Sequence, residues 1–376
     1  MGWCLHPIGG GGEKKFFRYA NLSTLPLSYT PHFRNPRNIP AWQLALRPTV
    51  EFYFRYAVLA IGLVGTAANA LVLYALVAQH ARETKKRVIN LLIINQNFMD
   101  LFCCLLLVIT VSVEIKNTYL TGAFGYFLCT IFINYTATDC ILDGSIINLV
   151  ALTLERYLKV VHPFWSKKHL KRWMIYTVMA FAWIAGIAMN VPLSFEVSRV
   201  EDGFCLYSFE LEFISGNCIV VMFFIIPLIV FVYSYGRIVV VLRRQMRVMA
   251  AHNVEGSSQM NASQAQSKRI KWNVIKTMII VSVAFVVCYC PNNLIYLILL
   301  YARDTSMYVW RKATVFLMYL NVCMNPFIYA TKHDGVKQQL ARLIVCRKPR
   351  DVGDAPGSSS NRAGGTQQTR PGVAHK

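Results

Sequence analysis

Charged residues are scarce in this chain, and acidic residues are scarcer than basic ones. Only 15% of its 376 residues are charged, whereas a soluble domain usually has about 25%. Mean hydropathy is +0.40. Several windows contain about 20 residues with almost no charge, which is the length needed to cross ~30 Å of hydrocarbon. These features exclude an ordinary soluble core and predict several membrane-spanning helices.

Several other patterns are also missing. The 11 cysteines form no paired CxxC motif, so no zinc site is predicted. Residues 1–13 lack the apolar core of a cleavable signal peptide, so we expect the first span to act as the insertion signal. In a soluble protein, a net charge of +21 would suggest nucleic-acid binding, but the sequence contains no nucleic-acid recognition motif. The sequence contains neither a nucleophile–base pair nor a phosphate-binding loop that would indicate an enzyme.

Seven apolar stretches are present, and the charge between them indicates their direction. We expect spans at about 52–77, 88–113, 124–157, 173–193, 214–242, 272–300 and 308–331. Basic residues crowd the links after the first and third spans, which is typical of cytoplasmic loops. The sequence therefore predicts an all-α membrane protein, a bundle of seven transmembrane helices with an outer N-terminus and an inner C-terminus.

The remaining segments complete the predicted organisation. Residues 1–50 form an outer tail with a glycosylation sequon at Asn21, and residues 51–331 form the bundle, with a third cytoplasmic loop at 243–271. Residues 332–346 predict a short amphipathic eighth helix on the inner leaflet. Cys346 is a candidate acylation site. Residues 347–376 are rich in Gly, Ser, Gln and Pro and are expected to be disordered.

Asp100 lies in the middle of the second span. Ionisable groups at that depth are costly and normally face the bundle interior. Asn69, Ser145, Asn321 and Asn325 fall at matching depths, so the carboxylate and its neutral neighbours could hold a small cation. The alternative is a hydrogen-bond network that only packs the helices. Both interpretations remain open at this point.

Each predicted span also carries a distinctive motif. In order, these are Asn69, Asp100, Glu155-Arg156-Tyr157, Trp183, Pro227 with Tyr235, Phe285 with Pro291, and Asn325-Pro326-Phe327-Ile328-Tyr329. With all of them in sequence, residues 50–346 resemble a rhodopsin-like (class A) G-protein-coupled receptor. The segment from Glu155 to Pro163 is similar to the peptide-binding branch of that family.

The resemblance implies roles for the matching residues. Cys129 and Cys205 would form an outer disulfide, and Asp100, Ser145, Asn321 and Asn325 would form a pocket for an allosteric sodium ion. The core switch would comprise Ile146, Pro227, Phe285, Tyr289 and Pro291. The inner mouth, where a heterotrimeric G protein would bind, would comprise Glu155, Arg156, Tyr157, Tyr235, Asn325, Pro326 and Tyr329. Arrestin, a receptor kinase and membrane lipid would be further partners, and nucleic acid would not.

Two departures from the family pattern carry expectations of their own. From Cys129 to Arg156 there are 27 positions, two more than the family usually has, so we expect a shift or bulge in the outer part of the third span. Lys271 stands where many members have an acid that pairs with the motif arginine. Because like charges repel there, we expect appreciable ligand-independent activity.

The nature of the ligand is less defined. The aspartate of amine receptors corresponds to Thr138 when counted from Arg156 and to Thr136 when counted from Cys129. Neither is acidic, which disfavours an amine, although Asp139 is adjacent to Thr138. The retinal-binding lysine is replaced by Tyr319, so no Schiff base can form. Asp139 and Asp143 share one helical face and either form a cation subsite in the ligand cavity or hydrogen-bond internally to the fourth and fifth spans.

An acidic outer loop that contains Glu201 and Asp202 favours a cationic ligand. The leading hypothesis is a basic peptide, and the alternatives are a small molecule, an amine or a lipid, or more remotely a seven-helix pump or channel. The candidate ligand residues are Thr138, Asp139, Asp143, Glu201, Asp202, Asn293, Tyr296 and Tyr319.

Overall fold

The computed structural model describes residues 41–82, 88–112, 119–207, 212–252, 258–302, 307–332 and 334–345. Asn21, Cys346 and the tail from residue 347 lie outside these ranges, as does the side chain of Lys271. The predictions for those positions stay predictions.

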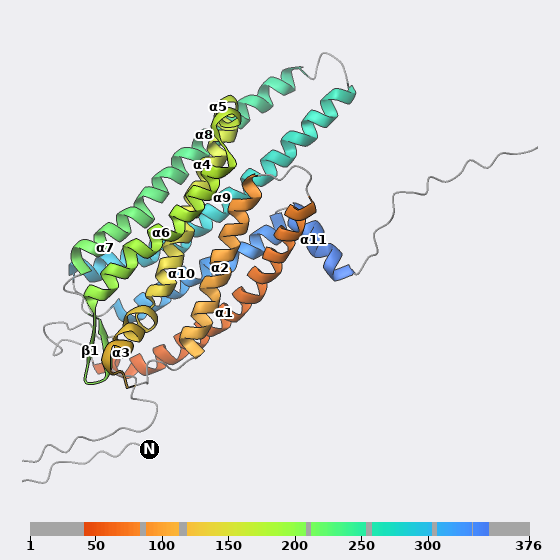
Figure 1. Ribbon diagram of the computed structural model, residues 1–376. Helices are drawn as coiled ribbons and strands as arrows, with labels where there is room; N and C mark the ends of the chain where they lie inside the picture. The colour runs from red at the N-terminus through yellow and green to blue at the C-terminus, as the bar shows by residue number, and fades with distance from the viewer. Residues whose placement is uncertain are drawn as a thin grey trace, which may run out of the picture.

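The predicted bundle of seven membrane-spanning helices is confirmed. Seven described helices are long and apolar enough to cross a membrane. They lie in α1 (Ala41–Arg82), α2 (Val88–Ser112), α4 (Thr136–Val161), α6 (Arg172–Val197), α8 (Ile226–His252) with α7 (Glu212–Val220) before it, α9 (Ser258–Ala302) and α10 (Tyr308–Lys332). The helix α11 (Asp334–Val345) follows them at the position predicted for an eighth helix. Figure 1 shows the long helices packed side by side.

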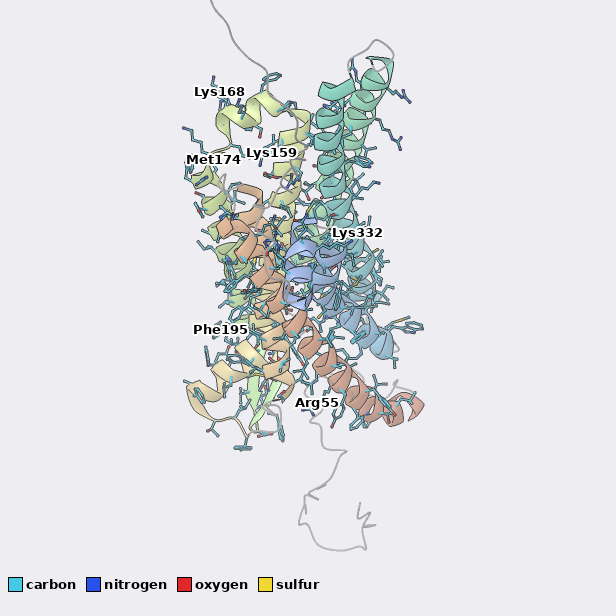
Figure 2. All side chains as sticks on the ribbon, turned by 90° about the vertical axis from the view of Figure 1, so that its right-hand side faces the viewer. Arg55, Lys159, Lys168, Met174, Phe195 and Lys332 are labelled. Atoms are coloured by element: carbon cyan, nitrogen blue, oxygen red, sulfur yellow. A yellow bond between two sulfur atoms is a disulfide. The ribbon has the colours of Figure 1, made fainter. Side chains whose placement is uncertain are left out.

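The two ends of the bundle differ. A hairpin of β1 (Ser198–Glu201) and β2 (Phe204–Tyr207) lies with α3 (Gly122–Leu128) at one end, which we call the Cys129 end (Figure 1). The short α5 (Pro163–His169) lies at the opposite end, which we call the Arg156 end. In Figure 2, Phe195 and Arg55 lie toward the first end, whereas Lys159 and Lys168 lie toward the second.

Polarity is distributed as a lipid environment requires. Large apolar side chains point outward, with Ile184 63% and Val232 68% exposed. Polar side chains are buried instead, and Asn69, Asp100 and Asn148 are fully inaccessible. Buried polar groups are costly unless they are hydrogen-bonded. The interior of the bundle, rather than its surface, is therefore where its specific chemistry lies.

The third span is broken near the Cys129 end. After α3, a π-helical turn η4 (Cys129–Ile133) leads to Tyr135, whose φ of 60° is left-handed, and α4 begins at Thr136. The predicted span over 124–157 therefore contains the irregularity that the extra spacing between Cys129 and Arg156 indicated. Thr136 Oγ1 donates to the Thr130 carbonyl at 2.6 Å, which satisfies a backbone acceptor beside the break.

A second π-helical turn, η5 (Val221–Ile225), immediately precedes the buried Pro227. Proline has no N–H to donate to the preceding turn, and its ring crowds the carbonyl four residues earlier. Bulges of this kind are a common response to such a local defect. The bulge places Phe223 and Phe224 inward, where both are buried.

Hydropathy underestimated the length of several helices. The helix α1 already begins at Ala41, inside the predicted outer tail, and α8 and α9 extend to His252 and from Ser258 into the predicted loop 243–271. Apolar composition marks only the part of a helix within the hydrocarbon. Backbone hydrogen bonding continues beyond it into the polar region, which composition alone cannot locate.

Two glycines allow α4 and α6 to approach closely. A Cβ on Gly186 would overlap the carbonyl oxygen of Cys140, and a Cβ on Gly144 would lie 2.8 Å from the carbonyl oxygen of Ala182. The absence of side chains at these two positions brings the backbones together, a common device in membrane helix packing. This contact positions Asp143 of α4 beside Asn190 of α6.

Candidate functional site

A cavity of about 200 Å³ lies between α4, α6, α7, α9 and α10, toward the Cys129 end. Ile146, Phe223 and Tyr289 contribute its apolar lining together with several aliphatic residues. Its polar lining comprises Asn134, Asp139, Asp143, Asn190, Ser194, Asn292, Asn293, Tyr296 and Arg311. An apolar pocket with a few converging polar groups is the usual form of a small binding site.

The two acids in this cavity have different surroundings. Asn190 donates to Asp143 Oδ2 at 2.8 Å and also to the carbonyl of Gly186 in its own helix at 3.0 Å. No described residue hydrogen-bonds the carboxylate of Asp139 in this way. Asp143 is therefore hydrogen-bonded internally and also lines the cavity, so both interpretations drawn from the sequence apply to it. Asp139 presents its carboxylate to the cavity.

The structure separates the other candidate ligand residues. Asn293 and Tyr296 line the cavity, but Thr138 is buried and is not among its described lining residues. Tyr319 is buried as well, and its ring packs on Tyr135 at a centroid distance of 6.3 Å.

Glu201 and Asp202 lie elsewhere, along a separate depression between the hairpin and α3. Asp202 and Gly203 form the hairpin turn with φ values of 50° and 79°. Asp-Gly is the sequence favoured for a two-residue turn of this hand. This gives Asp202 a structural role that its charge alone did not indicate.

The hairpin is fixed over the broken span. The disulfide between Cys129 and Cys205, which the resemblance implied, is present, with the two Cα atoms 5.3 Å apart. Asn134 Nδ2 also donates to Ser198 Oγ at 2.7 Å. Because Asn134 lines the cavity, these contacts join the hairpin to one wall of it.

Asp100 is at the centre of a buried polar network below the cavity. Its Oδ2 accepts from Asn325 at 2.8 Å, and its Oδ1 accepts from Ser145 at 3.2 Å. Asn69 links α1 to α10 by donating to the Val322 carbonyl at 3.1 Å. The expected grouping of Asp100 with Ser145 and Asn325 is therefore formed.

The sequence prediction missed part of this network. Gln96, one helical turn before Asp100, donates to Asp100 Oδ1 at 3.3 Å and contacts Ser145 Oγ. Asn148 donates to Gln96 at 2.8 Å and accepts from Asn95 at 2.9 Å. Trp183 in turn donates to Asn95 at 3.2 Å. The spacing of four between Gln96 and Asp100 was the available signal, since such residues share a helix face.

The donor set around Asp100 fits a small hard cation. The side-chain oxygens of Asn69, Asn321 and Asn325 are buried and accept no hydrogen bond from a described residue. Oxygen-only ligation by a carboxylate and neutral amides suits such an ion. Asp100, Ser145, Asn321 and Asn325 are the residues that would hold sodium, whose positive charge would offset the buried carboxylate.

The expected switch residues form a packed core that reaches the cavity lining. Phe285 is 1% exposed, and its ring stacks on Tyr289 at a centroid distance of 4.5 Å. Phe231 packs edge-on against Phe285 at 5.5 Å. Ile146 belongs to the same hydrophobic cluster as Phe285, and Pro227 is buried. Tyr289 lines the cavity and stacks on Phe285, so a group bound in the cavity would contact this core through Tyr289.

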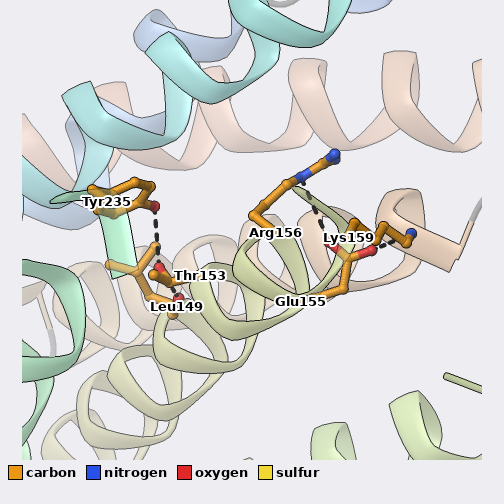
Figure 3. A network of polar contacts seen from close by, with 6 residues as sticks. All are labelled: Leu149, Thr153, Glu155, Arg156, Lys159 and Tyr235. Carbon is orange, nitrogen blue, oxygen red and sulfur yellow. Dashed lines mark hydrogen bonds and ion pairs between the residues drawn. The ribbon is translucent and has the colours of Figure 1, made fainter. Parts of the chain in front are cut away.

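At the Arg156 end, Glu155 contacts two basic side chains (Figure 3). Its Oε2 lies 3.5 Å from Arg156 Nε, and its Oε1 forms an ion pair with Lys159. The Glu155 side chain is only 2% exposed. A nearly buried carboxylate between two cations is strongly constrained, because removing a partner leaves an uncompensated charge.

The two tyrosines expected at this end differ in their hydrogen bonding. Tyr235 hydrogen-bonds Thr153 at 3.1 Å (Figure 3), and its hydroxyl also accepts from Ser282 at 3.3 Å. The hydroxyl of Tyr329 is buried and has no hydrogen-bond partner among the described residues. Pro326 lies within the same helix as Tyr329.

The motifs and the fold agree with a comparison against known families. A family model described as "7 transmembrane receptor (rhodopsin family)" matches residues 68–329, more than half of the chain. The chain belongs to the rhodopsin family of seven-transmembrane receptors. It is therefore a multi-pass membrane receptor, and the family is a receptor class rather than an enzyme class.

Individual relatives of this receptor are distant. The Danio rerio galanin receptor 2a is 27% identical, over 76% of this chain and 76% of the relative. The Rattus norvegicus somatostatin receptor type 5 is 28% identical, over 78% and 77% respectively. The crystal structure of squid rhodopsin matches with a TM-score of 0.64 at 15% identity, covering 81% of this receptor and 89% of that chain, which supports the fold alone.

Proposed function

We propose that this receptor resides in the plasma membrane with its N-terminus outside, binds a peptide with a basic group in the cavity, and activates heterotrimeric G proteins at the Arg156 end. The observation that carries the ligand proposal is Asp139, a carboxylate on the cavity wall to which no described residue donates. Similarity to receptors named for galanin and somatostatin supports a peptide. A charged partner is the natural complement of such a carboxylate.

The proposed direction of signalling follows from how the layers are stacked. A ligand in the cavity would contact Tyr289, whose ring stacks on Phe285. A ligand shifts a receptor between states only by its difference in affinity for them. A ligand that favours a different packing of Phe285 would favour an open Arg156 end, where Arg156, Tyr235 and Tyr329 would contact the G protein.

Basic residues near the Arg156 end support contact with the membrane as well. Arg243, Arg244 and Arg247 lie along the last turns of α8. Side chains of this kind interact with anionic lipid headgroups on the cytoplasmic leaflet. Arrestin and a receptor kinase are further proposed partners, because the tail from residue 347 contains Ser358, Ser359, Ser360, Thr366 and Thr369, which phosphorylation would make negatively charged.

The test is a G-protein dissociation assay in cells with pools of synthetic basic peptides. Asp139→Asn removes a charge without changing size, and we expect it to raise the half-maximal concentration of an activating basic peptide at least about tenfold, the usual loss for a charged hydrogen bond. Glu196→Gln is the matched control, because Glu196 is exposed at the same end but lines the hairpin depression. Equal potency on wild type and Asp139→Asn would contradict the proposal, as would activation by neutral small molecules or lipids alone.

A further inference from the structure

We propose that Arg311 binds a carboxylate of the ligand, so that the cavity accepts a ligand end that carries a positive group and a carboxylate together. This inference rests on the proposed function, because it concerns the same cavity and specifies the chemistry of the part that enters it. A peptide with a basic C-terminal residue and a free terminal carboxylate has both groups.

Arg311 lies on the cavity wall beside an aromatic ring. Its guanidinium carbon lies 5.4 Å from the ring centroid of Tyr296, and both residues line the cavity. Its Nη1 is buried and has no hydrogen-bond partner among the described residues. No described carboxylate forms an ion pair with it within 4.0 Å. A buried donor in this condition carries a desolvation cost that a bound acceptor would remove.

The neighbouring cation provides an internal comparison. Lys312 Nζ lies 2.7 Å from Glu51 Oε1 and 4.6 Å from the ring centroid of Phe54. Lys312 therefore faces α1 and is neutralised within the protein. Arg311 follows the other face of α10 into the cavity and is not neutralised in this way. This contrast distinguishes a cation used for packing from one available to a ligand.

Both charge signs meet in the same cavity. Asp139 contributes a carboxylate, Asp143 contributes one that already accepts from Asn190, and Arg311 contributes the only described positive side chain of the lining. Asp139 and Arg311 are not paired with each other within 4.0 Å, so both remain accessible to a ligand placed between them. A ligand with one charge would satisfy one of them, whereas a dipolar end satisfies both.

The size of the cavity and one amide group in its lining fit this description. Its volume of about 200 Å³ is below the roughly 300–1,000 Å³ of pockets for drug-sized ligands, which suits the end of a chain rather than a folded segment. The side-chain oxygen of Asn292 is buried there without a hydrogen-bond donor. A peptide N–H next to the terminal residue would supply that donor.

Binding of small probes to the purified receptor in lipid nanodiscs, measured by saturation-transfer NMR, tests this assignment. Nα-acetyl-arginine carries both groups, Nα-acetyl-argininamide lacks the carboxylate and Nα-acetyl-norleucine lacks the cation. We expect wild type to bind the first at least about tenfold more tightly than either of the others. Arg311→Gln should remove the preference for acid over amide, and Asp139→Asn the preference for arginine over norleucine.

Arg199→Gln is the matched control, because Arg199 is exposed on β1 and lines the hairpin depression, and it should retain both preferences. The Tm of each variant without probe reports its folding. If Arg311→Gln fails to fold, Arg311→Lys keeps the charge but loses the planar fork and should weaken the preference for acid. Equal binding of acid and amide by wild type, or no binding of any probe, overturns the inference without any variant.

Activation by peptide pools separates the two proposals. Pools that activate equally as free acids and as amides would overturn the role of Arg311 and leave the peptide function standing. Pools that are inactive in every form would count against the peptide function, while the probe measurements would still decide what Arg311 binds.

Discussion

Replacing Glu155 by glutamine should raise ligand-independent signalling. Glu155 is nearly buried and contacts both Arg156 and Lys159. Glutamine has almost the same size and keeps the helix, but it removes the negative charge that restrains Arg156. Released from that charge, Arg156 can extend toward a G protein, so the closed form loses a stabilising contact.

The size of the effect follows from the geometry. Two unit charges about 4 Å apart attract by roughly 4 kcal/mol at the effective dielectric constant near a protein surface. Burial of the carboxylate costs part of that energy. Lys159 also shares the carboxylate with Arg156. We expect a net change of about 1–2 kcal/mol, which alters the ratio of closed to open receptor by about 5–30-fold.

The measurement is G-protein dissociation in cells without ligand, normalised to surface receptor and compared with empty vector. Lys159→Gln is the matched control, because it removes the other ion pair of Glu155 and leaves the carboxylate to Arg156. We expect basal signalling to rise for Glu155→Gln and to stay the same or fall for Lys159→Gln.

Two results would refute this reasoning. Basal signalling of Glu155→Gln equal to wild type, at equal surface expression, would mean that the closed form is held elsewhere. An equal rise in Lys159→Gln would mean that loss of any charge at this helix end activates the receptor, with no particular role for the contact with Arg156.

Two further predictions concern the interior of the bundle. Gly186→Ala should lower the free energy of unfolding by about 1–3 kcal/mol, because its Cβ would overlap the Cys140 carbonyl. A Tm measured in detergent checks this. Gly236→Ala is the control: a Cβ at Gly236 would meet no atom within 4 Å, so the Tm should stay nearly unchanged. Replacing potassium by sodium at constant ionic strength should raise the Tm of wild type. At a sodium concentration ten times the Kd, the stabilising free energy is about 1.4 kcal/mol. Asp100→Asn should abolish the difference, and an equal sodium response in both proteins would exclude Asp100 as a sodium ligand.

The course of the bundle was predictable because hydropathy and loop charge report directly on the bilayer. The ends of α1, α8 and α9 were not, since helices continue past the hydrocarbon without any change that composition records. The extra spacing between Cys129 and Arg156 predicted an irregularity in the third span. Its form, a π-helical turn followed by a left-handed Tyr135, depends on where neighbouring donors can satisfy the backbone.

The candidate sites were predictable to different extents. Asp100 and its partners were found because an acid in the middle of an apolar span is conspicuous by itself. Gln96 was missed because a neutral amide carries no such signal, although it contacts both Asp100 and Ser145. Arg311 was missed for the opposite reason: it lies beside Lys312 at the start of a span, where basic residues are ordinary loop residues until the packing shows which one is paired.

The break at Tyr135 affects how parts of this receptor can be exchanged with those of its relatives. Residues from Thr136 onward keep their register with Arg156, whereas residues before Asn134 follow the disulfide at Cys129. A chimera joined within α4 would take the two extra positions between Cys129 and Arg156 from one parent and the rest of α4 from the other. A junction placed at Asn134–Tyr135 would exchange α3 and η4 as one piece and leave the Glu155–Arg156 helix undisturbed. Because Cys205 joins the hairpin to Cys129, the hairpin would have to come from the same parent as η4.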